Sequence, residues 1–302
     1  MDLPAGHTWR RATPDDVAAV CALVIAVDVE EYGEPDYEES DVREEWSHPG
    51  LDLARDSWLV HDAAGALVGY ALAWEKDPGS LVQADVFVHP DGPDLYPWLV
   101  ARVTERAADA ERVHVFSSEP NARRAAALTA AGYAVCRVFR RMVLDLAAPV
   151  ADPDPPPGVV VRGVTPADLP AVWALVRDSF AQHFDYVAEP YDAWHARLVG
   201  GESYRPDLWW LAEVDGVPAG FLIGVMHEEN GWVRSVGTLP SARGRGVGTA
   251  LLQTAFAAFR ENGAPRVGLG VDSDNTTGAM ALYERLGMRA EQRYDCYELT
   301  RG

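Results

Sequence analysis

The stretch RGRGVGT at residues 243–249 decides the fold. A stretch of β type, residues 232–240, precedes it, and an apolar helical pattern begins at Ala250. Glycines let a backbone approach a ligand closely and adopt positive φ. The amides of such a turn and of the first helical turn converge where the helix dipole favours negative charge. Residues 243–249 therefore predict an anion site suited to a pyrophosphate.

The order of residues in this loop excludes two common nucleotide-binding motifs. No Lys-Ser/Thr pair follows the glycines, so the loop is not a Walker loop. The order R-x-x-G-x-G, with no evident acidic ribose partner about 20 residues further on, is not a Rossmann fingerprint. The remaining alternative is a surface turn that only caps an ordinary helix.

The residues after the loop carry a second motif. A strand is expected at residues 266–272, followed by Asn275, a short helix with LYERLGM at residues 282–288, and a β-rich end at 294–299. Together the two motifs resemble the GNAT acetyltransferases, whose pattern is an R/Q-x-x-G-x-G/A loop and then an Asn-led helix with Leu-Tyr-Glu-x-x-Gly. The resemblance covers residues 209–299. It implies an acyltransferase enzyme with acetyl-CoA as donor and an amine as the usual acceptor.

The chain also repeats itself. RRATPDDV at residues 10–17 matches RGVTPADL at residues 162–169, and each predicts a strand followed by a Thr-Pro helix start. Five prolines within residues 149–158 indicate a stiff linker. We therefore predict an α/β (α+β) chain of two tandem GNAT folds, each a mixed, mostly antiparallel twisted sheet flanked by helices. The expected domains are 1–148, a degenerate copy, and 159–302, the catalytic copy with the one acetyl-CoA site of the chain.

The first copy has lost the residues of the anion site. In residues 91–98, Pro93 replaces the anchor arginine, and Tyr96 and Trp98 replace the later glycines. Proline has no amide to donate, and bulky side chains would fill the phosphate space. Leu128 stands at the position of the tyrosine in the later motif. We predict that this copy binds acetyl-CoA weakly or not at all.

Composition limits the partners. The net charge of -20 and the pI of about 4.7 disfavour nucleic acid and anionic membranes. No segment has the length of a transmembrane helix, and the first residues lack the apolar core of a signal peptide. We predict a cytoplasmic monomer or weak dimer. The spacing of Cys21, Cys136 and Cys296 fits neither a metal site nor a disulfide framework, so no metal is predicted.

The resemblance assigns the donor site residue by residue. It implies that the backbone at residues 236–238 pairs with the pantetheine arm like an added strand, and that the amide near Thr238 polarises the acetyl carbonyl. Asn275 would contact the CoA arm or fix the start of a helix. The loop amides would hold the pyrophosphate. The predicted cofactor-binding residues are Val236, Gly237, Thr238, Arg243, Gly244, Arg245, Gly246, Val247, Gly248, Thr249, Asn275 and Tyr283.

The sequence indicates a general acid for the transfer but no single general base. A positioned phenol can protonate a leaving thiolate, so Tyr283 is the candidate general acid, with a core aromatic as the alternative. The usual position of a base in GNAT enzymes falls on Trp232, which cannot accept a proton. The candidate bases are Glu228 and Glu229, which precede an Asn-Gly hairpin pair, and Asp272 at a strand end. A water chain or an already neutral amine would also serve.

The acceptor is expected to be a small-molecule amine. Arg234 favours an acceptor with a carboxylate or phosphate, unless it forms a salt bridge. The acidic run at residues 28–45, with ten carboxylates and one arginine, would instead attract a cation, although such runs are usually solvated. The predicted acceptor-binding residues are Trp232, Arg234, His183, Phe184 and Tyr186.

Several acceptors remain open. The tandem arrangement resembles the mycothiol synthases, which acetylate the cysteinyl amine of a pseudodisaccharide thiol. An amino acid, an antibiotic or its precursor, and a protein N-terminus are alternatives. A non-catalytic regulatory protein that binds acetyl-CoA is the competing class.

Overall fold

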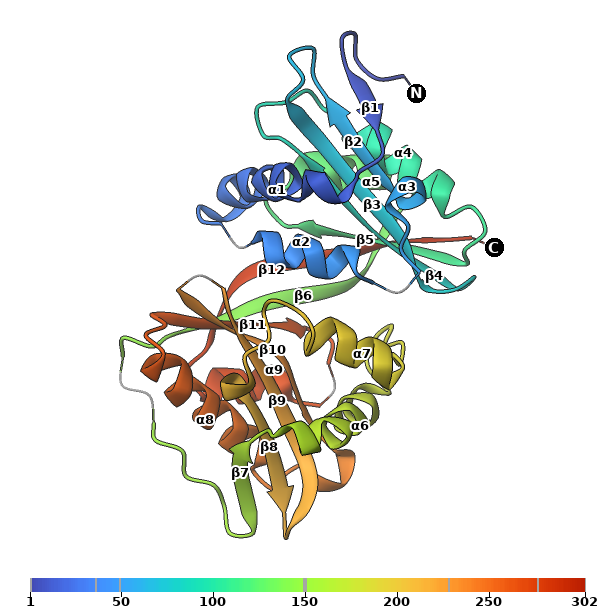
Figure 1. The fold of residues 1–302 in the computed structure, drawn as a ribbon. Helices are drawn as coiled ribbons and strands as arrows, with labels where there is room; N and C mark the ends of the chain where they lie inside the picture. The colour runs from blue at the N-terminus through green and yellow to red at the C-terminus, as the bar shows by residue number, and fades with distance from the viewer. Residues whose placement is uncertain are drawn as a thin grey trace. The chain divides into compact units, whose positions relative to one another are not determined.

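The computed structural model describes residues 2–35, 37–48, 50–148, 151–227, 229–275 and 277–301 (Figure 1). The chain forms two compact units. Unit 1 comprises Met1–Phe139 and Gln292–Gly302, and unit 2 comprises Arg140–Glu291. Unit 1 therefore contains most of the last strand of the chain, and unit 2 contains the second half of β6.

Unit 1 is a mixed sheet with the strand order β1-β2-β3-β4-β5-β12-β6. The pairs β1–β2, β2–β3, β3–β4 and β5–β12 are antiparallel, and β4–β5 is parallel. Its strands are β1 (Thr8–Arg10), β2 (Ser57–His61), β3 (Leu67–Asp77), β4 (Leu81–Val88), β5 (Arg112–Ser118), β6 (Ala134–Asp145) and β12 (Arg289–Thr300). Its helices are α1 (Val17–Tyr32), α2 (Glu39–Trp46), α3 (Leu53–Asp56), α4 (Tyr96–Arg106) and α5 (Ala122–Ala130).

Unit 2 has the corresponding order β6-β11-β10-β9-β8-β7. The pairs β7–β8, β8–β9 and β9–β10 are antiparallel, and β10–β11 is parallel. Its strands are β7 (Val159–Gly163), β8 (Trp209–Val214), β9 (Val217–His227), β10 (Asn230–Thr238) and β11 (Arg266–Asp272). Its helices are α6 (Leu169–Phe180), α7 (Tyr191–Leu198), α8 (Val247–Glu261) and α9 (Ala279–Arg285).

The repeated Thr-Pro segments start both units in the same way. Thr13 and Thr165 each begin a short 3-10 helix with a capping box, closed by Asp16 and Asp168 respectively. Arg10 Nη1 donates to Asp16 at 2.7 Å, and Arg162 Nη1 donates to Asp168 at 2.8 Å. The hydrogen bond from Arg10 lowers the pKa of Asp16 to about 2, so the pair stays charged at neutral pH. The sequence repeat is thus also a repeat of local hydrogen bonding.

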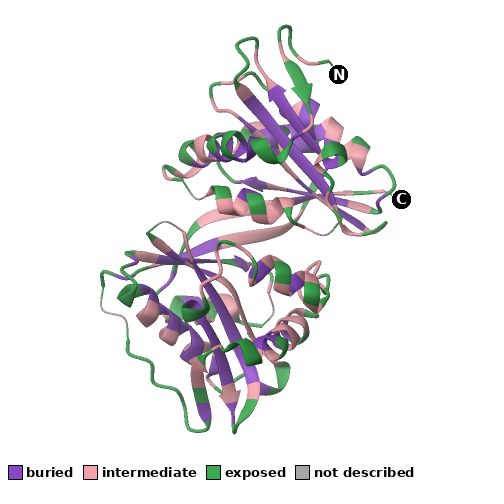
Figure 2. Cartoon of the chain, viewed as in Figure 1, coloured by how far each residue is buried: buried purple, intermediate pink, exposed green. Residues whose placement is uncertain are grey.

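Each sheet has a hydrophobic core on both faces, and the buried residues follow its central strands (Figure 2). In unit 1, α4 and α5 contribute Leu99 and Leu128 to one core, and α1 contributes Leu23 to the other. In unit 2, α8 contributes Phe256 to one core, and α6 contributes Leu175 to the other. Each unit is a mixed, mostly antiparallel sheet flanked by helices, which confirms the predicted fold class.

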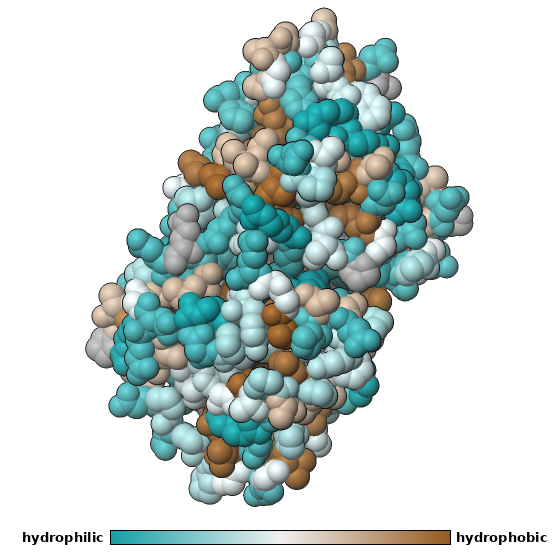
Figure 3. Space-filling model, viewed as in Figure 1, coloured by the Kyte–Doolittle hydropathy of each residue, from teal (hydrophilic) through white to brown (hydrophobic). Residues whose placement is uncertain are grey.

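The face of the molecule in Figure 3 is mostly hydrophilic. Hydrophilic residues cover most of the face in Figure 3, and the hydrophobic residues are scattered among them. Among the described residues, no helix is both long enough and apolar enough to cross a membrane.

Candidate functional site

Two parallel strands of unit 2 separate after a short stretch of pairing. Within their described residues, β10 and β11 pair at Gly231↔Val267 and Trp232↔Gly268, and the pairing goes no further. The rest of β10 remains paired with β9 on its other side, from Ser235↔Ile223 to Thr238↔Gly220. One edge of β10 at residues 235–238 is therefore open toward β11, and an extended ligand could pair with it as a strand does.

A β-bulge lies at the point where the strands separate. The β9–β10 register shifts between Val233 and Ser235, so Arg234 is the extra residue. A bulge bends a strand and redirects its side chains. The alternation of side chains between the two faces of β10 is therefore interrupted at Arg234, and strand spacing alone does not place Arg234 on the same face as Trp232.

The glycine-rich loop connects the end of β10 to α8. Gly244 and Gly246 both have positive φ, of 77° and 80°. The first intrahelical hydrogen bond runs from the amide of Ala250 to the carbonyl of Gly246 at 3.0 Å. The amides of residues 247–249 precede that bond and form the first turn of a 15-residue helix. The loop thus leads into a helix whose first amides have no intrahelical partner, which is the local structure expected from residues 243–249.

Gly246 and one further glycine, Gly248, lie close to neighbouring segments. A Cβ at Gly246 would lie 2.6 Å from Cγ of Pro156, and a Cβ at Gly248 would lie 3.2 Å from Cδ2 of Leu282. The Gly248 position is also 3.8 Å from Oγ1 of Thr238. The end of β10, the first turn of α8 and the residue before Tyr283 therefore meet at one place.

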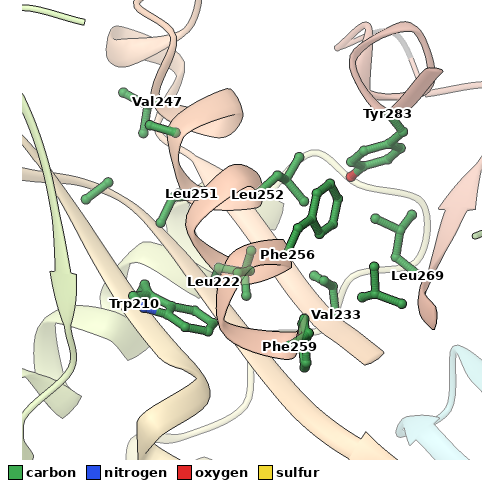
Figure 4. Packing of buried hydrophobic residues seen from close by; sticks show 14 of the residues in the cluster. Trp210, Leu222, Val233, Val247, Leu251, Leu252, Phe256, Phe259, Leu269 and Tyr283 are labelled. Atoms are coloured by element: carbon green, nitrogen blue, oxygen red, sulfur yellow. The ribbon is translucent and has the colours of Figure 1, made fainter. Parts of the chain in front are cut away.

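Tyr283 lies on α9 and projects into the core cluster that contains Leu252, Phe256 and Leu269 (Figure 4). Its side chain is 7% exposed, and burial raises its pKa to about 12. Its hydroxyl forms no hydrogen bond with the described residues, yet it is not among their fully buried polar atoms. The ring is thus held by packing, while the O–H remains available to a ligand.

Asp272 and Asn275 shape the turn that leads to α9. Asp272 ends β11, and its Oδ1 accepts the amide of Asp274 at 2.9 Å. The Asn275 amide donates to the Asp272 carbonyl at 3.2 Å, and Asn275 Oδ1 accepts the Thr277 amide at 2.8 Å. Asn275 therefore closes an Asx turn before the helix that carries Tyr283.

An aromatic cluster forms around the end of α6. The Phe180 ring lies with its centroid 4.4 Å from that of His183, 6.1 Å from that of Tyr186 and 6.2 Å from that of Phe221. A Cβ at Gly237 would lie 2.6 Å from Cε1 of Phe221. Two predicted acceptor residues, His183 and Tyr186, are thus connected through Phe180 and Phe221 to the open part of β10. Phe184 is half-buried in the same segment.

Ser179 is a residue of this region that the sequence did not indicate. It is 5% exposed, and its Oγ has no hydrogen-bond partner among the described residues. A Cβ at Gly237 would lie 3.1 Å from that Oγ. Buried hydroxyls usually have a partner, so one beside the open strand is consistent with a ligand that provides it.

His183 is influenced by charges from two other elements. Burial lowers its pKa, the positive charge of Arg243 lowers it further, and the negative charge of Asp272 opposes them. The loop residue Arg243 and the strand-end residue Asp272 are thus electrostatic neighbours of His183. The imidazole is neutral at neutral pH and able to accept a proton.

Two other residues predicted for the site, Trp232 and Arg245, do not belong to the aromatic cluster. A Cβ at Gly268 would lie 2.6 Å from Cζ3 of Trp232, and the Arg141 guanidinium lies 5.1 Å from its ring centroid. Trp232 thus packs between β11 and β6. Arg245 Nη2 donates to Asp215 at 2.9 Å on an exposed turn. Glu228 lies outside the described residues.

In unit 1, side chains fill the corresponding space. The strands β4 and β5 pair in parallel from Leu81↔Arg112 to Ala84↔Val115, and within their described residues the pairing ends there. Arg124 lies 5.2 Å from the ring centroid of Phe87 on β4, and its Nη2 donates to Glu31 at 3.0 Å. Both partners of this ion pair are 6% exposed.

The same network reaches the start of α4. Asn121 Nδ2 donates to the Tyr96 hydroxyl at 2.7 Å and also to Glu31, and the Ser118 hydroxyl at the end of β5 donates to Glu31. Tyr96 stands where unit 2 has a loop glycine. The acidic run is therefore not solvated throughout, because Glu31 is buried within this network.

Comparisons with known proteins cover both halves of the chain. The model of the acetyltransferase (GNAT) family matches residues 169–288. The mycothiol acetyltransferase of Salinispora arenicola is 31% identical, over 92% of this chain and 91% of the relative.

Solved structures show the same architecture. A GCN5-related N-acetyltransferase from Sphaerobacter thermophilus is 28% identical with a TM-score of 0.81, covering 99% of this chain and 97% of that one. A tandem GNAT protein from the clavulanic acid biosynthesis pathway has a TM-score of 0.76 over 98% of this chain and 99% of its own, at 16% identity. At that identity the second likeness concerns the fold alone.

Proposed function

The chain belongs to the GNAT acetyltransferase family, and on this premise we propose that unit 2 transfers acetyl from acetyl-CoA to the primary amine of a small molecule. The observation that carries the proposal is the separation of β10 from β11 beside a glycine-rich helix start. The open strand edge would bind the pantetheine arm of acetyl-CoA, and the helix start next to it would bind the pyrophosphate.

The donor is held by backbone groups. Within the loop of residues 243–249, the amides of Arg243 and Arg245 donate to the carbonyls of Pro240 and Ala242 at 3.4 Å. The amides of Gly244 and of residues 246–249 are left to bind the pyrophosphate, and Thr249 adds a hydroxyl. The pantetheine arm lies along residues 236–238 as an added strand, and the amide near Thr238 polarises the thioester carbonyl. Ser179, whose hydroxyl faces Gly237, offers a further donor to a carbonyl in this place.

The transfer is a direct attack of the amine on the thioester carbon. The C–N bond forms, the C–S bond breaks, and the thiolate of CoA takes the phenol proton of Tyr283. Since burial raises the pKa of Tyr283 to about 12, the phenol is protonated at every pH at which the enzyme would work. Leu282 lies close to Gly248, and this contact keeps the next residue, Tyr283, beside the loop.

The amine must lose a proton, and His183 is the residue that we assign to accept it. It lies at the end of α6, within the aromatic cluster that reaches Gly237. Asp272, one of the candidate bases expected from the sequence, would then stabilise the imidazolium rather than act as the base itself, because its charge favours the protonated ring. Glu228 remains a candidate outside the described residues.

The acceptor surface combines aromatic and charged groups. Tyr186 and Phe184 provide apolar contacts, and Arg234 at the bulge could bind a carboxylate or phosphate. A second candidate acceptor is the cysteinyl pseudodisaccharide of the mycothiol synthases, because a relative named mycothiol acetyltransferase aligns with nearly the whole chain. The tryptophan at position 232, where GNAT enzymes commonly place a base, favours a different arrangement for proton removal in this chain.

The test is release of the CoA thiol from acetyl-CoA across a panel of amines. The panel sets amino acids and peptides against polyamines, aminoglycosides and a glucosaminide-linked cysteine. Release with a carboxylate-bearing amine supports the role of Arg234, and release with the cysteine conjugate supports the second candidate. Tight binding of acetyl-CoA without release for any amine would overturn the transferase proposal and favour a regulatory protein.

A further inference from the structure

Three side chains of the types that bind metal ions lie close together in unit 1, although they are far apart in the sequence. They are His114 on β5, Cys136 on β6 and Cys296 on β12, and one possible ligand atom from each lies within 4.8 Å of the other two. His114 and Cys296 are buried, at 2% and 0% exposure, and Cys136 is half-buried. The cluster is separate from the acyl-CoA site proposed above, which lies in unit 2.

The strand register explains this convergence. In the β5–β12 pair, His114 is opposite Glu298 and Phe116 is opposite Cys296. Alternate residues of a strand share a face, so His114, Cys296 and Glu298 lie on one face of the sheet. Cys136 joins them from the neighbouring strand, where its Sγ lies 3.4 Å from the carbonyl oxygen of Cys296.

We propose that His114, Cys136 and Cys296 bind one Zn²⁺ ion. Two thiolates and an imidazole are ligands that Zn²⁺ prefers, and two thiolates also neutralise its charge. Zn–S bonds of about 2.3 Å and Zn–N bonds of about 2.0 Å place tetrahedral ligand atoms roughly 3.5–3.8 Å apart. The separations in this cluster are therefore within about 1 Å of a bound geometry, a shift that rotation of the cysteine side chains can supply.

Glu298 completes the surroundings of such a site. Its Oε2 lies 2.8 Å from Nε2 of His114. Histidines that bind metals usually donate their other ring N–H to a carboxylate, which fixes the tautomer and the ring orientation. With Nε2–H donating to Glu298, Nδ1 is the nitrogen that would bind the ion. The fourth ligand would be water, entering from the side of the half-buried Cys136.

A bound ion would stabilise unit 1 at its last strand. The ligands come from three strands, and the chain between Cys136 and Cys296 passes through all of unit 2. A cross-link that closes so long a loop removes much conformational entropy from the unfolded chain. Because the site does not exist in the unfolded chain, the free energy of binding adds to that of folding. We therefore expect Zn²⁺ to raise the melting temperature.

The test uses the reduced, metal-free full chain. Zn²⁺ is titrated in competition with a chromophoric chelator, and Co²⁺ is then bound as a spectroscopic probe of thiolate ligands. Cys136→Ser removes the half-buried ligand with the least risk to folding. Cys21→Ser is the matched control, since Cys21 is a buried cysteine of the same unit outside the cluster.

The expected result is one Zn²⁺ per chain, with a melting temperature that rises on binding, and tetrahedral Co²⁺ bands with thiolate charge transfer. Cys21→Ser should keep all of these, Glu298→Gln should weaken binding about tenfold, and Cys136→Ser should weaken it about 100-fold or more. Equal affinity in the wild type and Cys136→Ser would overturn the proposal. So would a Cys136–Cys296 disulfide in the purified protein together with no Zn²⁺ binding after reduction, which would make the two cysteines a redox pair.

Discussion

Units 1 and 2 each contain a pair of parallel strands that separate after a few residues, but different groups stand where the strands part. In unit 2, β10 leads into a loop with two glycines at positive φ and an open helix start. In unit 1, the buried pair of Arg124 and Glu31 lies between the end of β4, the end of β5 and Tyr96 at the start of α4.

The difference indicates how one copy of a repeat loses a ligand and keeps its fold. Where two strands separate, their backbone groups need hydrogen-bond partners and the space between them must be filled, either by a ligand or by side chains. Unit 1 fills that space with its own ion pair and hydrogen bonds. On our account unit 2 leaves it for acetyl-CoA, and this comparison yields four predictions.

The largest effect is expected from Gly246→Val. A side chain there is strained at a φ of 80° and would meet Pro156 at 2.6 Å, so the loop amides would lose their arrangement. Affinity for acetyl-CoA should fall about a thousandfold, or roughly 4 kcal/mol, in a calorimetric titration. Gly263→Ala, at a φ of 85° with no neighbours at the other end of α8, is the control for backbone strain and should bind normally. If Gly246→Val bound acetyl-CoA with wild-type affinity, the loop would not be the binding site of the cofactor.

Arg124→Ala should destabilise the protein by about 3 kcal/mol, because it leaves the buried Glu31 carboxylate without its cation. Urea unfolding measures the loss, which should not be accompanied by a new acetyl-CoA site. Arg102→Ala, which breaks the more exposed Arg102–Glu105 pair, should cost less than about 1 kcal/mol. A comparable cost for the two variants would mean that the Arg124 network does not hold unit 1 together.

Tyr283→Phe should lower kcat about 100-fold with little change in the affinity for acetyl-CoA, because only the proton donor is removed. With a pKa of about 12, this group should cause no loss of activity up to about pH 10. Tyr297→Phe, in the core of unit 1, is the matched control. Steady-state rates decide the matter, and an unchanged kcat would leave Tyr283 with a packing role.

The smallest effect is expected from His183→Gln, about tenfold in kcat/KM at neutral pH. Because the pKa of His183 is lowered by burial and by Arg243, the wild-type kcat/KM should fall only as the pH drops below about 6.5. The His183→Gln variant should not show this fall of kcat/KM at low pH (the acid limb of the pH profile). His195→Gln, on α7, should still show it. If the acid limb persisted in His183→Gln, another group would be the one that accepts the proton of the amine.

The sequence was sufficient where the structure depends on a local stretch of chain. The loop at residues 243–249, the Asx turn at Asn275 and the repeated capping boxes are all set by neighbours within a few residues. The fold class and the family, predicted from these motifs, are confirmed. The roles of the site residues, Tyr283 included, remain predictions.

Long-range contacts could not be predicted in this way. Glu31 meets Arg124 from 93 residues away, and the hydroxyl of Ser179 meets Gly237 only because α6 packs on β10. The bulge at Arg234 results from pairing with β9 rather than from its own sequence. The convergence of Cys136 and Cys296 likewise depends on the last strand joining unit 1, which no spacing in the sequence indicates.

The central claim is that only one of the two units binds the donor. Calorimetric titration of the full chain with acetyl-CoA, followed by the same titration of Gly246→Val, tests it most directly. The account predicts one molecule of acetyl-CoA per chain for the wild type and an affinity about a thousandfold lower for the variant. Two molecules per chain, or one molecule that Gly246→Val binds with wild-type affinity, would contradict it.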